Sequence, residues 1–319
     1  MTHLPYIGFK WHLNQEGERM KTVHGKTQIF PYVIHRIYNR VPGQVIDYGV
    51  QLINAPIVWK ETRGEGVKVA VLDTGVDIAH PDLAPNIKGG YNFLDRNDNY
   101  ADNHGHGTHV TGIIAGTDNG VGVVGVAPRT DIYALKVLDE NGEGSESHVI
   151  EAIDWAVDNR VQVLNLSFGS QKPNGKLRSV IEKATQAGIV FVAAAGNDAT
   201  KTVSLDSIDY PARWSDLVIT VAAVDRNIKR APFSSQGPEL YLAAPGVDIL
   251  STYPRNRYVR LSGTSMAAPH ISGAVALILA AARKKSIPNV KPSDVRKVLV
   301  KNAIQLGDHN DYGYGFFRF

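Results

Sequence analysis

Three histidines lie within six residues of one another in the stretch NHGHGTHVTG: His104, His106 and His109. An imidazole titrates near neutral pH and can serve as a metal ligand or as a general base. A zinc site needs a third or fourth ligand of suitable type and a helical spacing such as H-E-x-x-H, which these three do not provide. We therefore expect one of them to be a base whose partners lie elsewhere in the chain.

The chain supplies the residue types that such a base would need. An acyl-transfer site requires a hydroxyl nucleophile, a carboxylate that orients the base and a donor for the oxyanion. The sequence LDTG contains Asp73, AAAGN contains Asn197 and GTSMAAPH contains Ser265. Singly, such an Asp or Ser is often only a turn or helix cap. Taken together with His106, the set favours catalysis.

The order of these residues along the chain separates unrelated hydrolases. Here it is Asp73, His106, Ser265. A lipase-type enzyme places its serine first, within G-x-S-x-G, whereas residues 263–267 read GTSMA and lack the second glycine. A trypsin-type enzyme begins with its histidine and is an all-β barrel. Neither alternative fits the chain.

Strands and helices that could position these residues alternate along the chain. Short apolar runs predict buried parallel strands at 67–73, 131–138, 161–168, 188–197 and 216–224. Helical spacing predicts helices at 107–116, 145–160, 176–188 and 261–285. The alternation indicates an α/β fold in one main domain, a mainly parallel central sheet with helices on both faces. Chemistry in such folds gathers beyond the carboxyl ends of the strands, where Asp73 and Asn197 fall.

Composition narrows the function further. The chain has 319 residues and no cysteine, which excludes thiolate metal sites and cysteine nucleophiles. No run approaches 18 apolar residues, so we expect no membrane partner. The net charge is +3, of which residues 1–43 carry +4, but without a dense Lys/Arg run we expect no nucleic acid partner. The N-terminus lacks the pattern of a secretory signal, which predicts a cytoplasmic location unless a leader is missing from the sequence.

Four stretches resemble the signatures of the subtilisin-like serine proteases: VLDTG (71–75), HGTHVTG (106–112), AAAGN (193–197) and GTSMAAPH (263–270). Matching stretches run from about Gln44 to YGYGFF near the C-terminus. The resemblance implies Asp73 as the orienting carboxylate, His106 as the general base and Ser265 as the nucleophile. It also implies that the Asn197 amide and the Ser265 backbone N–H form the oxyanion hole. His104 and His109 are then bystanders.

The resemblance further implies a structural Ca²⁺ site in the glycine-rich stretch after the histidine helix. All its expected ligands are hard oxygen atoms, which suits calcium. The matching positions are Gln44, Asp82, Thr117, Asn119, Val121 and Val123. The alternative is a plain turn, because only Asp82 carries a formal charge.

A substrate cleft is also implied. Enzymes of this family hold a polypeptide substrate as an extra strand between two edges, here Gly142, Glu143 and Gly144 on one side and Ser167, Phe168 and Gly169 on the other. The pocket for the residue before the cleaved bond (the S1 pocket and P1 residue) would be lined by Ala194, Ala195 and Gly196, with Asp198 at its rim and Asp209 at its floor. Two carboxylates there would favour a basic P1 residue. If Asp209 turns to solvent, a broad preference for large apolar residues is expected instead.

We expect residues 1–43 to form a separate N-terminal extension before a peptidase domain at 44–319. IFPY (29–32) and RVPG (40–43) resemble the short leader of the intracellular subtilisin branch. A proline near a scissile bond distorts the extended pose that a protease needs. We therefore expect this propeptide to lie across the cleft as a poor substrate. A homodimer is possible by the same resemblance.

Two other function classes remain to be separated from a peptidase. One is a binding module on a protease fold that has lost catalysis, against which the intact set of Asp73, His106, Ser265 and Asn197 argues. The other is an esterase or amidase that acts on small substrates, against which the two peptide-binding edges argue.

Overall fold

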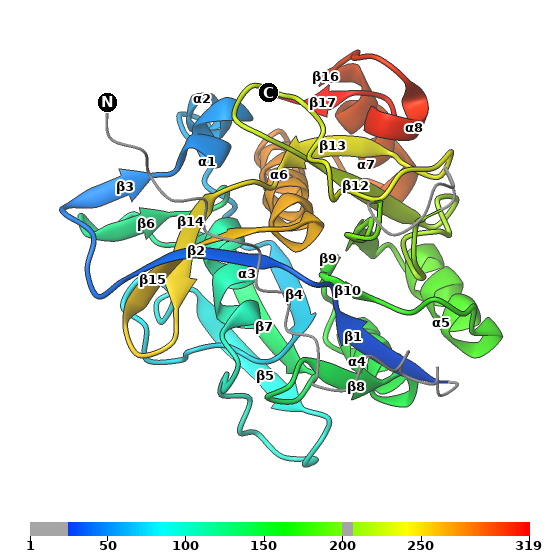
Figure 1. Cartoon of the computed structure of the whole chain (residues 1–319), viewed down its shortest axis with the longest axis horizontal. Coiled ribbons are helices and arrows are strands. Elements are labelled where there is room, and N and C mark those ends of the chain that lie inside the picture. The colour runs from blue at the N-terminus through cyan, green and yellow to red at the C-terminus, as the bar shows by residue number, and fades with distance from the viewer. Residues whose placement is uncertain (1–24, 200–206) are drawn as a thin grey trace, which may run out of the picture.

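The computed structural model describes residues 25–199 and 207–319. A nine-stranded sheet forms its centre, in the order β16-β17-β13-β12-β11-β9-β4-β7-β5 (Figure 1). All neighbours in this sheet pair in parallel except β16 and β17. The strands are β4 (Lys68–Asp73), β5 (Ile87–Asn92), β7 (Asp131–Lys136), β9 (Val163–Leu166), β11 (Val190–Ala194), β12 (Val218–Val224), β13 (Leu242–Pro245), β16 (Ala303–Ile304) and β17 (Phe316–Phe317). The predicted mainly parallel sheet is confirmed.

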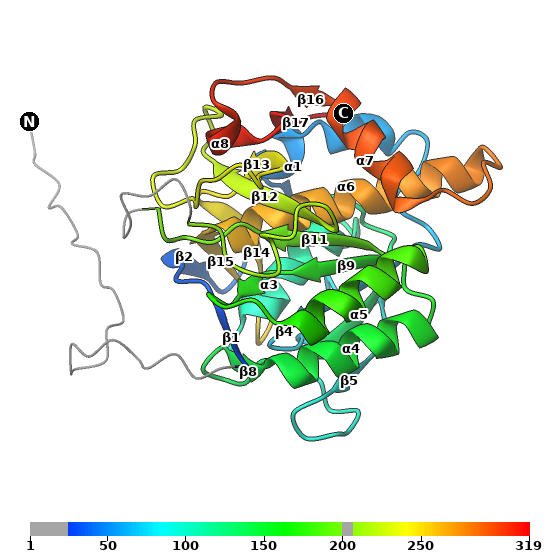
Figure 2. The same cartoon turned by 90° about the vertical axis from the view of Figure 1, so that its right-hand side faces the viewer.

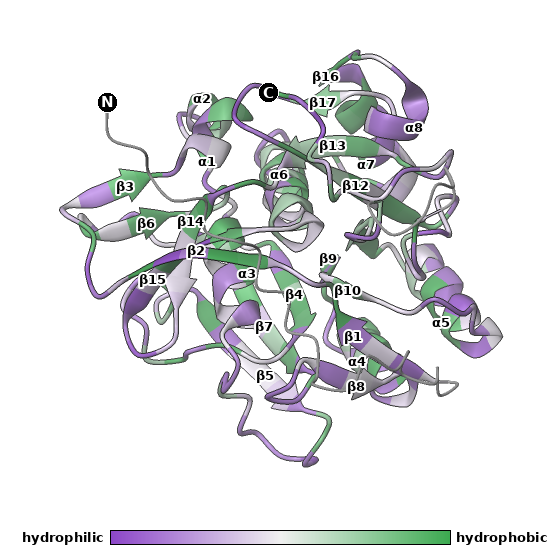
Figure 3. Ribbon diagram, viewed as in Figure 1, coloured by the Kyte–Doolittle hydropathy of each residue, from purple (hydrophilic) through white to green (hydrophobic). Residues whose placement is uncertain are grey.

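The central strands are apolar along their whole length because both faces of the sheet are covered. All five residues of β11 and all seven of β12 are buried. Runs rich in valine and alanine, rather than alternating patterns, are typical of a parallel sheet enclosed by helices. Figure 3 shows the result as green strands in the interior, with hydrophilic residues on the outer turns of α5.

Helices cover both faces of the sheet, with α4 and α5 side by side below it and α6 above it in Figure 2. The helix α6 is long and apolar enough to cross a membrane by composition alone, but 78% of that window is buried inside the protein. The helices are α1 (Tyr48–Leu52), α2 (Ala55–Val58), α3 (His106–Ala115), α4 (Glu146–Asp158), α5 (Gly175–Gln186), α6 (Thr264–Lys284), α7 (Pro292–Lys301) and α8 (His309–Tyr312).

Three smaller sheets each include one strand from the segment that precedes the first helix. The first has the order β10-β1-β8, the second β14-β15-β2, and the third pairs β3 with β6. Their bounds are β1 (Lys26–Ile29), β2 (Val33–Tyr38), β3 (Gln44–Ile46), β6 (Gly122–Val124), β8 (Glu143–Ser145), β10 (Phe168–Gly169), β14 (Ile249–Tyr253) and β15 (Arg257–Ser262). The N-terminal segment is thus integrated into the fold from Lys26 onward.

One predicted strand is divided in the structure. The run 161–168 forms β9 up to Leu166 and then leaves the parallel ladder, since Phe168 and Gly169 pair with β1 in another sheet. The sequence pattern alone cannot show this change, because all residues of both strands are buried.

Two fully buried histidines lie on α3 and α6. His109 on α3 lies with its Nε2 atom 3.1 Å from the carbonyl oxygens of both Ile249 and Val259. Burial lowers the pKa of His109 to about 3 and that of His270 on α6 to about 4. Both imidazoles are therefore neutral in the folded protein at pH values where an unfolded chain would protonate them.

This difference predicts that stability falls as pH falls from about 6.5 towards 4. In that window the unfolded chain binds protons at His109 and His270 that the folded chain does not, so each residue contributes up to about 1.4 kcal/mol per pH unit. Urea unfolding in a Ser265→Ala background, which removes the expected nucleophile, measures the slope. His109→Gln should reduce that slope by about 1.4 kcal/mol per pH unit, which is the contribution of one proton. An equal slope in His109→Gln would contradict the assignment.

Candidate active site

The carboxylate of Asp73 and the imidazole of His106 meet where β4 ends and α3 begins. The His106 Nδ1 atom lies 2.8 Å from Oδ1 and 3.0 Å from Oδ2 of Asp73, and both side chains are fully buried. Asp73 also accepts a hydrogen bond from the Thr74 backbone N–H, at 2.8 Å. A carboxylate held in this way fixes which ring nitrogen carries the proton and leaves Nε2 available.

A second buried carboxylate, which the sequence analysis did not identify, positions the helix that carries His106. Asp102 accepts from the backbone N–H groups of Gly105 and Thr108, at 2.8 and 2.9 Å, and from the Thr108 hydroxyl. Its Oδ1 atom also accepts from Thr74 Oγ1 at 2.9 Å. An aspartate just before a predicted helix is a capping signal, so the sequence did contain the clue.

Ser265 lies in the first turn of α6 and is fully buried. Its Oγ atom donates to the carbonyl oxygen of Ser167 at 3.0 Å. Within residues 25–199 and 207–319, Nε2 of His106 has no hydrogen-bond partner. The structure thus joins the predicted Asp73 and His106, while the hydroxyl of Ser265 is hydrogen-bonded to Ser167 rather than to the imidazole.

Asn197, beyond the end of β11, joins this group. Its Oδ1 atom accepts from the backbone N–H and the hydroxyl of Thr264, at 3.0 and 2.9 Å. These two donors determine the orientation of the amide, so that Nδ2 points into the cleft. There it donates to the carbonyl oxygen of Pro31 at 2.7 Å. The predicted oxyanion donor is therefore directed at a backbone carbonyl.

The two predicted substrate-binding edges are close enough to hold one strand between them, and that strand is β1. Gln28 pairs with Gly169 on one side and Glu143 on the other, both antiparallel. Thr27 pairs with Gly144, and the Ile29 backbone N–H donates to the Gly142 carbonyl at 2.9 Å. The chain's own N-terminal segment thus lies between β8 and β10 (Figure 1).

Phe30 occupies the predicted S1 pocket. The residue is only 4% exposed. A Cβ placed on Gly169 would lie 2.5 Å from the Cζ atom of the ring, and one on Gly196 would lie 3.6 Å from its Cε1 atom. The predicted lining residues Ala194 and Ala195 are fully buried.

The two predicted acidic residues of the pocket have different surroundings. The Cβ atom of Asp209 lies 3.0 Å from the position that a Cβ of Gly169 would take, which places it at the pocket. The Asp198 backbone N–H donates to Ser235 Oγ at 3.2 Å. Most of the loop between them, residues 200–206, lies outside the described residues.

Tyr32 packs over the imidazole of His106. Their ring centroids are 5.5 Å apart, and Tyr32 lies 6.1 Å from the ring of His104. Burial raises the pKa of the Tyr32 hydroxyl, and the negative charges of Asp102 and Asp73 raise it further. Burial also lowers the pKa of His104. The N-terminal segment therefore covers His106 with a neutral aromatic side chain.

The predicted calcium ligands converge around Asp82. Its Oδ2 atom accepts from the Val123 backbone N–H at 2.8 Å, and its Oδ1 atom lies 3.3 Å from Asn119 Nδ2. Gln44 Nε2 lies 3.3 Å from the Thr117 carbonyl oxygen and 3.5 Å from that of Val121.

A cation bound here would rely mainly on carbonyl oxygens. Among the described residues no three His, Cys, Asp or Glu side chains gather as a metal site. The oxygen and nitrogen of an amide can be exchanged by a rotation, so Gln44 and Asn119 can each present an oxygen to a cation. The donor set of one carboxylate, two amides and carbonyls fits calcium.

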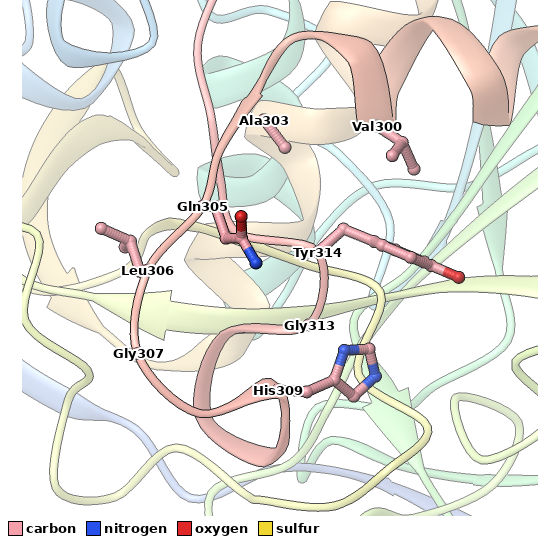
Figure 4. Close-up of a pocket in the computed structure, with 8 residues that line it drawn as sticks. All are labelled: Val300, Ala303, Gln305, Leu306, Gly307, His309, Gly313 and Tyr314. Carbon is pink, nitrogen blue, oxygen red and sulfur yellow. The ribbon is translucent and has the colours of Figure 1, made fainter.

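A separate cavity of about 330 Å³ lies among the C-terminal elements (Figure 4). Its lining includes His309 and Tyr314, whose rings are 5.6 Å apart, but no carboxylate, serine or cysteine. This cavity therefore lacks a nucleophile that could act together with a general base. The cleft around Ser265 remains the candidate active site.

Comparison with known proteins identifies the family of the chain. The model of the subtilase family matches residues 64–315. The chain is 45% identical over 276 residues to subtilisin DY of Bacillus licheniformis, which covers 86% of this chain and 97% of the relative. It is 44% identical to a thermostable alkaline protease of Halalkalibacterium halodurans, over 85% and 72% of the two chains. It is 40% identical to an intracellular serine protease of Paenibacillus polymyxa, over 89% and 87%. The chain therefore belongs to the subtilase family of serine endopeptidases.

Proposed function

We propose that this endopeptidase cleaves polypeptides through an acyl-enzyme on Ser265. The Ser265 Oγ atom attacks the scissile carbonyl carbon while its proton passes to Nε2 of His106, whose Nδ1–H is held by Asp73. The negative charge on the carbonyl oxygen is stabilised by Asn197 Nδ2 and the Ser265 backbone N–H. Collapse of the tetrahedral intermediate breaks the C–N bond, and the amine leaves with the proton from His106. A water molecule then attacks the acyl-enzyme, with His106 as its base, and releases the carboxylic acid and free Ser265.

The observation that carries this proposal is the path of the N-terminal segment. It runs as a strand between both edges of the cleft and presents a backbone carbonyl to Asn197. This is how an extended polypeptide would bind, with backbone hydrogen bonds providing affinity. A site for small esters or amides would not need two such edges.

We further propose that residues 1–43 are an inhibitory leader and that the peptidase domain proper begins at Gln44. With Phe30 in the S1 pocket, a substrate would present the Phe30 carbonyl to Asn197, yet the Pro31 carbonyl is there instead. The Phe30–Pro31 bond is therefore displaced from Ser265 by one residue. Ser265 is turned towards Ser167, and Tyr32 covers His106.

The leader is not an optimal ligand for the cleft. Thr27 is 2% exposed, and its hydroxyl has no hydrogen-bond partner in the part of the chain that the structure describes. A buried hydroxyl without a partner costs about 1–3 kcal/mol. This cost weakens the hold of the leader, which suits a segment that must eventually leave.

A cleavable leader tests both proposals. A recognition sequence for an unrelated cysteine protease, inserted between Tyr38 and Gln44, allows the leader to be cut from the folded chain. If the leader fills the cleft in 99 of 100 molecules, cutting should raise peptide hydrolysis about 100-fold. Ser265→Ala should abolish activity. Asn197→Ala should lower kcat about 10²–10³-fold, the magnitude established for the corresponding amide of a subtilisin, with little change in KM.

Two results would count against these assignments. Full activity with residues 1–43 retained, shown by intact mass, would remove the inhibitory role. Undiminished turnover in Ser265→Ala would remove the proposed nucleophile.

We propose that the S1 pocket accepts large apolar residues, because it holds the ring of Phe30. The alternative is a basic preference through Asp209 and Asp198. Two chromogenic tetrapeptides that differ only at P1, Phe against Arg, distinguish these. We expect Phe to be favoured. A tenfold preference for Arg, about 1.4 kcal/mol in transition-state free energy, would instead show that Asp209 acts on the substrate. In that case Asp209→Asn should remove the preference.

We propose that Gln44, Asp82, Thr117, Asn119, Val121 and Val123 bind a structural calcium ion, which would hold the loop after α3 against the N-terminal strand β3. Free calcium at 100 times its Kd should stabilise the folded protein by about 2.7 kcal/mol. Thermal unfolding of Ser265→Ala with calcium and with a chelator measures this effect. Asp82→Asn should remove most of it. Asp118→Asn, in the same loop but paired with Arg63, is the matched control. Equal calcium stabilisation in Asp82→Asn would contradict the site.

We propose a cytoplasmic location. The relative from Paenibacillus polymyxa, which is named an intracellular serine protease, supports this proposal. The expected partners are polypeptide substrates and the chain's own leader. A homodimer remains a proposal from the family resemblance.

A further inference from the structure

The N-terminal segment does not end at the cleft but continues along a second edge. After Tyr32 it forms β2, which pairs antiparallel with β15 from Val33 opposite Ser262 to Tyr38 opposite Tyr258. The strand β15 leads directly into Gly263 and the start of α6, where Ser265 lies. The second edge is therefore continuous with the catalytic serine.

The register assigns positions to this segment. If Phe30 marks P1, Val33 to Tyr38 correspond to the third to eighth residues after the cleaved bond, P3′ to P8′. Ile34 and Ile37 are 50% and 46% exposed, so their side chains contribute little to the pairing. Recognition along most of this edge is therefore by the main chain, which tolerates many sequences.

Two side chains fix the register. His35 is the extra residue at the bulge opposite Arg260 and Leu261, and its Nε2 atom lies 2.6 Å from Ser262 Oγ. At the far end, Tyr38 packs against the buried cluster of Val123, Leu250 and Tyr258. The edge thus ends at a site that accepts an aromatic residue.

We propose that the β15 edge is a binding site for the part of an extended polypeptide substrate that follows the cleaved bond, from P3′ to P8′, with an aromatic residue favoured at P8′. The proposal rests on the proposed function, in which the leader occupies the place of a substrate. A strand edge of this length is accessible only to an extended segment, so the site would favour unfolded chains over short peptides or compact proteins.

The test uses the folded chain from which the leader has been cut after Tyr38, with its absence confirmed by intact mass. Internally quenched peptides share one cleavable Phe and the same residues before it, and have three, six or eight residues after it. We expect kcat/KM to rise at least tenfold from three to eight residues. Tyr→Ala at P8′ should lower it about threefold.

N-methylation separates strand pairing from a simple effect of length. Methyl groups on the backbone nitrogens at P5′ to P7′ of the eight-residue peptide should remove the gain, because at least one of these N–H groups faces β15 in an antiparallel pair. A peptide lengthened instead on the other side of the bond controls for size.

The possible failures are distinguishable. Efficient cleavage of the three-residue peptide with no gain at greater length, or a gain that survives N-methylation, would overturn the inference and leave the proposed function intact. If no peptide is cleaved, the proposed function fails, and the inference fails with it.

Discussion

The side chain of Asn197 connects the three parts of the molecule on which the account depends. Its oxygen accepts two hydrogen bonds from Thr264, which ties the end of β11 to the start of the helix that carries Ser265. Its nitrogen is then free to point into the cleft, where it holds the Pro31 carbonyl of the leader. A donor fixed in advance stabilises developing charge without reorganising, and the same property lets it hold a backbone carbonyl here.

The remainder of the site follows from where the fold places helix starts and strand ends. Asp73 ends β4, His106 begins α3 and Ser265 begins α6, so the parallel sheet brings together residues far apart in the sequence. The buried polar groups around them are satisfied by Thr74 and Asp102. Such networks hold a single geometry because a half-satisfied buried network is costly. Within the described part of the chain, the Nε2 atom of His106 has no hydrogen-bond partner, and the ring of Tyr32 packs over this imidazole.

The sequence allowed much of this architecture to be predicted. Apolar runs gave the parallel strands, because a strand buried on both faces has no polar alternation, and four motifs indicated Asp73, His106, Asn197 and Ser265. The pairing of β1 with β8 and β10 could not be located residue by residue, since it joins segments such as Lys26 and Glu143 that are 117 residues apart.

Other features of the site had no signal in the motifs. The orientation of Ser265 towards Ser167 depends on a hydroxyl rotation. The placement of the Pro31 carbonyl on Asn197 depends on a shift of one residue along the cleft. Asp102 was missed for a different reason, since an aspartate before a helix is common and its five hydrogen bonds appear only in three dimensions.

The central claim is that Ser265 is the nucleophile and that the leader holds it out of alignment with His106. Its most direct test is the rate at which a small fluorophosphonate labels Ser265, followed by intact mass and peptide mapping, before and after the leader is cut. The account predicts slow labelling of the uncut chain, rapid labelling of the cut chain at Ser265 alone, and none in Ser265→Ala. Equal rates before and after cutting would show that the leader does not control the serine, and labelling at another residue would show that the nucleophile was wrongly assigned.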